Sequence, residues 1–99
     1  MQQSQDKYSR ETILKSDTAG GKTQDETVNL FILALRNGDT DKAASYFMLD
    51  QNLSRENWVK TLKQMKDGGL LDKMINDLNK NNIEFEFNNY SGVWKIKNL

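Results

Sequence analysis

The stretch Glu26–Phe47, ETVNLFILALRNGDTDKAASYF, decides how this chain folds. Its apolar residues recur at positions i, i+3, i+4 and i+7, the spacing of one helix face: Val28, Phe31, Ile32 and Leu35. Gly38 interrupts the pattern, because glycine readily adopts the left-handed conformation that ends a helix. The stretch therefore predicts two helices, over about 24–37 and 40–48, joined by a tight corner.

Capping residues mark where these helices begin. Thr23 and Glu26 have the spacing of a capping box, in which a hydroxyl and a glutamate three residues later satisfy free backbone N–H groups. Asp39 or Thr40 caps the second helix. Further along the chain, apolar residues at helical spacing predict a third helix up to about residue 66 after a start near Ser54, and a fourth over about 70–79.

The period of the apolar pattern changes from 3.6 to 2 near the end of the chain. Residues 83–87, IEFEF, alternate apolar and acidic side chains, and residues 93–97, VWKIK, alternate apolar and basic ones. This alternation is typical of half-buried strands, and the Asn- and Gly-containing stretch between them favours a turn. We expect an antiparallel hairpin in which Glu84 and Glu86 lie on the solvent face, opposite Lys95 and Lys97.

Together these patterns predict one α+β domain over residues 23–99, with four helices followed by a hairpin packed on them. Residues 1–22 are polar, and we expect them to form a flexible arm or linker, because they bury too little apolar surface to offset the entropy of ordering. The predicted core comprises residues from every element of the domain: Val28, Phe31, Ile32, Leu35, Phe47, Leu62, Leu71, Ile75, Phe85, Trp94 and Ile96.

Composition excludes several classes of site. The 99 residues contain no Cys and no His, which removes thiolate metal sites and the commonest general base at neutral pH. The 14 basic residues balance 14 acidic ones and are not clustered, so the sequence lacks the electrostatic pattern of a nucleic-acid-binding protein. The carboxylates fall on polar helix faces or on the solvent face of a strand. We therefore expect no catalytic residues, no cofactor and no metal site.

One short motif has a more ordinary interpretation. Gly20-Gly21-Lys22-Thr23 is similar to the end of a phosphate-binding loop, but Ser16 stands where the motif requires its first glycine. The stretch before it is also a poor candidate for the buried strand that precedes such a loop. A flexible joint followed by a helix cap explains these four residues better.

The segment Asn29–Phe47 resembles the opening helices of bacterial nuclear-transport-factor-2-like domains, and Gly92–Ile96 resembles their closing strand. In those domains a helix ending in A-L-x-x-G-D precedes a short A-x-x-Y-F helix, and the matching residues here are Ala34, Leu35, Gly38, Asp39, Ala43, Tyr46 and Phe47. The resemblance implies a cone-like fold with a pocket, here in a reduced form. Helices occupy the place of the family's first strands, so no family catalytic residue can be transferred. Tetratricopeptide-type helix pairs share part of the pattern, but their 34-residue repeat is absent.

From the residues and the resemblance we expect a non-catalytic protein-interaction or accessory domain. The alternative is a small-ligand-binding or enzymatic pocket protein of the nuclear-transport-factor-2-like type. A closed apolar pocket that contains a buried carboxylate or tyrosine would favour this alternative. A filled core would favour the interaction domain.

A two-stranded hairpin leaves an open sheet edge, and open edges can accept another strand. We expect interaction residues around this edge, namely Ile83, Phe85, Phe87 and Trp94. The sequence leaves three alternatives for what covers this edge: a second copy of the chain, another protein, or the arm around Ile13-Leu14 of the same molecule. In the resembled bacterial domains, a linker such as residues 1–22 often follows an N-terminal membrane anchor. The resemblance thus implies a longer natural protein that is tethered to a membrane outside the cytoplasm.

Overall fold

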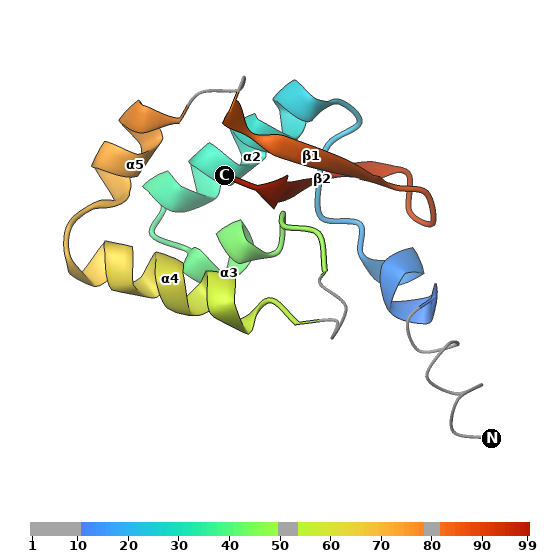
Figure 1. The fold of residues 1–99 in the computed structure, drawn as a ribbon, viewed down its shortest axis with the longest axis horizontal. Helices are drawn as coiled ribbons and strands as arrows, with labels where there is room; N and C mark the ends of the chain where they lie inside the picture. The colour runs from blue at the N-terminus through green and yellow to red at the C-terminus, as the bar shows by residue number, and fades with distance from the viewer. Residues whose placement is uncertain (1–10, 50–53, 79–81) are drawn as a thin grey trace.

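The computed structural model describes residues 11–49, 54–78 and 82–99. These contain five helices and a C-terminal antiparallel hairpin that packs against the helices, so the predicted α+β class is confirmed (Figure 1). Residues 11–16 form the first, short helix. The other elements are α2 (Gln24–Arg36), α3 (Thr40–Ala44), α4 (Glu56–Asp67), α5 (Leu71–Asp77), β1 (Glu84–Asn88) and β2 (Val93–Asn98).

Local capping explains where α2 and α3 begin. The hydroxyl of Thr23 accepts a 3.1 Å hydrogen bond from the backbone N–H of Glu26, as the sequence predicts for the start of α2. Gly38 lies at φ +70° just after α2. Asp39 then caps α3 by accepting a 3.0 Å hydrogen bond from the N–H of Lys42. The predicted corner between the two helices is therefore confirmed.

The helix α3 ends four residues before the predicted boundary at residue 48, because the chain that follows it pairs with β2. The N–H of Ile96 donates to the carbonyl of Tyr46 at 2.8 Å, and the N–H of Met48 donates to the carbonyl of Ile96 at 2.7 Å. This long-range pairing satisfies backbone groups that a longer helix would have satisfied internally. Helix propensity is a weak prior that such tertiary contacts override.

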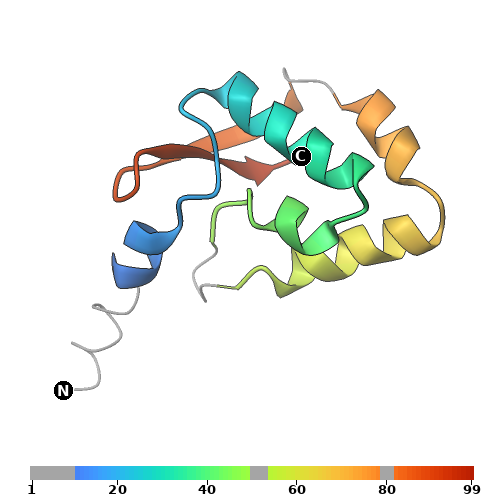
Figure 2. The same ribbon diagram turned by 180° about the vertical axis from the view of Figure 1, so that it is seen from behind.

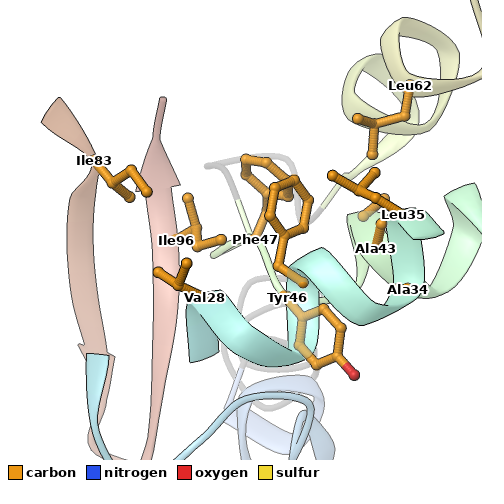
Figure 3. Close-up of a cluster of buried hydrophobic side chains, with 11 residues drawn as sticks. Val28, Ala34, Leu35, Ala43, Tyr46, Phe47, Leu62, Ile83 and Ile96 are labelled. Atoms are coloured by element: carbon orange, nitrogen blue, oxygen red, sulfur yellow. The ribbon is translucent and has the colours of Figure 1, made fainter. Parts of the chain in front are cut away.

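The core lies between α2, α4 and the hairpin (Figure 3). Phe47 is at its centre: its ring stacks on Trp58 with a centroid distance of 3.9 Å and meets Phe31 edge-on at 5.4 Å. Six residues of the predicted core are buried: Val28, Phe31, Leu35, Phe47, Leu62 and Ile96. Another four pack on the cluster while partly exposed, namely Ile32, Leu71, Ile75 and Phe85. Trp94 is only half-buried.

The register of the hairpin confirms one of the two predicted glutamate–lysine pairings, that of Glu86 with Lys95. Phe85 lies opposite Ile96, Glu86 opposite Lys95 and Phe87 opposite Trp94. An irregularity between Glu84 and Phe85 places Glu84 opposite Asn98, so the predicted pair of Glu84 with Lys97 does not form.

The prediction that Lys95 faces solvent is wrong, since the structure buries this residue completely. Phe87 departs from the prediction in the opposite direction. It was expected on the packed face, but it is 40% exposed. The turn end of the hairpin projects beyond α3, α4 and α5 (Figure 1).

The chain before α2 explains the burial of Lys95, because it packs on β2 and on the turn end of the hairpin. Leu14 is buried, and its carbonyl accepts a 2.9 Å hydrogen bond from the side-chain amide of Asn88. Gly21 pairs with Trp94 of β2, and a Cβ atom at Gly20 would collide with the Trp94 carbonyl. The two glycines thus allow a close approach of two backbones. Figure 2 shows this segment crossing beside the hairpin before the chain enters α2. In that view, α2 lies on the near side of the sheet.

Residues 11–22, the described part of the predicted arm, therefore lie against the domain. Residues 1–10 of that arm lie outside the described residues.

Candidate functional site

A buried ionic cluster surrounds Lys95, the residue whose position the sequence did not predict. The Lys95 ammonium donates to the Asp17 carboxylate at 3.0 Å and to the backbone carbonyls of Ala19 and Ser45 at 2.5 Å each. An ammonium has three N–H donors, so these three acceptors satisfy it. The contacts join β2 to the segment before α2 and to the end of α3.

The second partner of the Asp17 carboxylate is Arg55, at the start of α4. Arg55 Nη2 donates to Asp17 Oδ2 at 2.6 Å, and Arg55 Nε donates to the carbonyl of Phe47 at 3.1 Å. The side chain of Asp17 is 7% exposed and that of Arg55 is 23% exposed. Asp17 thus balances a fully buried cation and a partly buried one.

The geometry of the cluster indicates a structural role, in which it holds distant segments of the chain together. Burial lowers the pKa of Lys95 to about 8, while its hydrogen bond to Asp17 and the Asp17 charge act in the opposite direction. A catalytic lysine must offer a free amine to a substrate. Lys95 instead has no exposed surface and no unused N–H group. A lysine in an alternating strand usually indicates a solvent face, and no sequence signal pairs it with Asp17, 78 positions away.

The second candidate is the outer edge of the hairpin. Among the described residues, β1 pairs through its backbone only with β2. By contrast, β2 is covered on both edges, since its second edge meets Gly21 and the chain at Tyr46–Met48. Every second residue of an edge strand directs its N–H and C=O groups away from the sheet. The outer edge of β1 is therefore open in the part of the chain that the structure describes.

The four predicted interaction residues do not form one surface. Ile83 is buried in the core, and Phe85 packs against the core while partly exposed. Phe87 and Trp94 do lie together, with ring centroids 5.2 Å apart and planes inclined by 60°. They form an aromatic pair near the turn, beside the open edge. Within the described residues, no backbone hydrogen bond joins Ile13 or Leu14 to β1; the carbonyl of Leu14 accepts instead from the side-chain amide of Asn88.

The third candidate is a pocket of about 370 Å³ between α4, α5 and the open end of the hairpin. Its lining is mostly apolar, and the side chain of Leu70 beside it is 46% exposed. The ion pair between Lys73 and Asp77, at 3.3 Å, lies at the exposed rim. The lining residues are Met65, Leu70, Lys73, Met74, Asp77, Leu78, Asn82, Ile83 and Leu99. No local pattern in the sequence indicates this pocket, because it combines residues of three separate elements.

The pocket offers little for catalysis. Its carboxylate, Asp77, is 66% exposed and paired with Lys73, so it is neither buried nor free. Of the tyrosines that the structure describes, none lines the pocket. The described residues hold no group of three or more acidic side chains arranged to bind a metal ion. No helix within the same ranges is both long enough and apolar enough to cross a membrane.

Comparison of the chain with family models, with curated proteins and with solved structures found no match.

Proposed function

We propose that this chain is a non-catalytic protein-interaction domain that binds a partner by adding a strand to the outer edge of β1. One observation carries the proposal: within residues 11–49, 54–78 and 82–99, β1 has a backbone neighbour on one side only, whereas the chain covers both sides of β2. An added strand would satisfy the outward backbone groups of β1 and cover the exposed Phe87.

The residues present support a role without catalysis. The chain contains no His and no Cys. Lys95, the buried amine, has its three donors occupied by Asp17 and two carbonyls, so it offers no nucleophile to a substrate. The exposed position of Asp77 gives the pocket no carboxylate of the kind that acid–base catalysis uses.

We also propose that the domain has a reduced cone-like fold and is tethered to a membrane in a longer protein. The resemblance to bacterial nuclear-transport-factor-2-like domains supports a reduced cone-like fold, with the hairpin as the remnant of the larger sheet. The polar composition of residues 1–22 supports a linker that connects the domain to a membrane anchor outside the cytoplasm. Isolating the natural gene product and sequencing its N-terminal region tests this setting. A native start at Met1 would contradict it.

The second candidate function is the binding of a small apolar ligand in the pocket between α4 and α5. Its volume of about 370 Å³ and its apolar lining favour this function. Ligand pockets in proteins typically measure about 300–1,000 Å³.

One experiment distinguishes the two functions. Binding peptides are selected from a random display library against the full chain, and each is titrated into ¹⁵N-labelled protein while amide shifts are followed by NMR. Strand addition predicts that the largest shifts fall within Glu84–Asn88 and that these amides become protected from hydrogen exchange. Shifts centred on Met74, Leu78 and Leu99 would support the pocket instead. A selection that yields no binder at β1 would contradict the proposed function.

A further inference from the structure

We infer that the partner strand belongs to a different protein and alternates basic with apolar residues. This inference rests on the proposed addition of a strand to β1. It assigns the chemistry of the partner from the charges and exposed side chains along that edge.

The acidic face of β1 carries the first part of the argument. Glu84 and Glu86 are exposed and, by the alternation of a strand, lie on the same face. Neither forms an ion pair within the described residues. Lys95 lies opposite Glu86 across the hairpin, but its ammonium is buried and held by Asp17. The two glutamates therefore present uncompensated negative charge on one face of β1, the strand with the open edge.

A second copy of the chain matches this face poorly. An antiparallel pair of β1 strands related by a two-fold axis keeps equivalent residues on the same face. The register that pairs all five residues of β1 sets Glu86 directly opposite the Glu86 of the second copy. A shift of two residues toward the start of the strand sets Glu84 opposite Glu86. Like charges directly opposite each other destabilise a strand pair.

Basic residues at those positions reverse the interaction. Lysine or arginine opposite Glu84 and Glu86 forms the cross-strand charge pairs that stabilise sheets. The intervening residues of the added strand point to the other face, where Phe87 is 40% exposed next to Trp94. Apolar side chains at these positions would cover the aromatic pair. A strand that alternates basic and apolar residues satisfies both faces.

Three synthetic peptides test the inference, each seven residues long with blocked ends. The first alternates Lys and Val, the second alternates Glu and Val, and the third has the composition of the first in a non-alternating order. Each is titrated into the ¹⁵N-labelled full chain by NMR at moderate salt. We expect the Lys–Val peptide to shift the β1 amides and to bind about tenfold or more tightly than either of the others.

A charge-reversed variant provides the matched control. Glu84 and Glu86 are exposed, so Glu84→Lys with Glu86→Lys should keep the fold, which the amide spectrum and thermal melting check. This double variant should prefer the Glu–Val peptide by a similar factor. The reversal distinguishes recognition at β1 from general attraction of a cationic peptide.

The outcomes separate the inference from the function on which it rests. Shifts at β1 with equal affinity for both alternating peptides would leave strand addition standing and overturn the assignment of a basic partner. Self-association of the unmodified chain through β1, seen by sedimentation, would also overturn it. If no peptide shifts the β1 amides of either protein, both the proposed function and the inference fail.

Discussion

At the scale of single residues, Lys95 is the most unusual feature of the molecule. Removing an ammonium from water costs several kcal/mol, which its neighbours must offset. Here the offset comes from one carboxylate and two carbonyls, all from segments distant in the sequence. Loss of any one partner destabilises the folded protein, because it leaves a buried charge or carbonyl without a hydrogen bond. We interpret Lys95 as the residue that specifies how these segments meet.

The titration of Lys95 gives a prediction with a definite sign. Its pKa is lowered from 10.5 to about 8 in the folded protein, mainly by burial, with Asp17 opposing and Arg55 reinforcing the shift. Between these two values the unfolded chain binds more protons than the folded one, so folding becomes more favourable as pH rises. Lys95→Met removes this titration. The difference in free energy of unfolding, wild type minus variant, should therefore increase from about pH 8 to about pH 10.5.

Urea unfolding of both proteins at a series of pH values measures this difference. A difference that stays constant across the range would show that Lys95 keeps an ordinary pKa in the folded state.

A substitution at Phe31 tests the predicted core through the free energy of unfolding. Its side chain is fully buried and meets the ring of Phe47 edge-on, so Phe31→Ala should leave a cavity and cost about 3–5 kcal/mol. Leu33→Ala, on the same helix, is the matched control because Leu33 is 56% exposed. Its cost should stay within about 0.5 kcal/mol. Similar denaturation midpoints for the two variants would remove Phe31 from the core.

At the scale of elements, the segment before α2 is held by Asp17. Asp17→Asn keeps the shape of the side chain but removes the charge that balances Lys95 and Arg55. Breaking one partner of a buried ion pair typically costs about 3–5 kcal/mol. Asp77→Asn is the control, because the pair of Asp77 with Lys73 is exposed and worth about 0–1 kcal/mol. Thermal melting of the two variants compares them, and equal melting temperatures would contradict the role of Asp17.

The elements differ in how far the sequence could predict them. Helices α2 and α3 follow from capping residues and apolar spacing, which are local, as the Thr23 and Asp39 caps show. Helices α4 and α5 follow from apolar spacing without a side-chain cap, and the helix over residues 11–16 was not predicted. The hairpin follows from alternation and its turn. The early end of α3 and the burial of Lys95 depend on partners far along the chain, so no local pattern contains them. The same applies to the pocket, whereas the open edge could be anticipated from the small number of strands.

At the scale of the whole molecule, the open edge of β1 affects how copies of the chain behave together. Exposed sheet edges promote association between molecules, and charged side chains along them oppose it. Glu84 and Glu86 have this position. Because Glu86 would meet its own copy in the register that pairs all five residues of β1, we expect the wild-type chain to remain a monomer in solution.

Neutralising Glu84 and Glu86 should allow the chain to self-associate. Glu84→Gln with Glu86→Gln removes the repulsion and keeps side-chain size, so sedimentation at increasing protein concentration should show dimers of the variant only. Asp67→Asn with Asp72→Asn is the matched control, since these exposed carboxylates lie on α4 and α5 and change the net charge equally. A control that dimerises as strongly would assign the effect to net charge. A monomeric Gln variant would show that the edge is protected by something other than its glutamates.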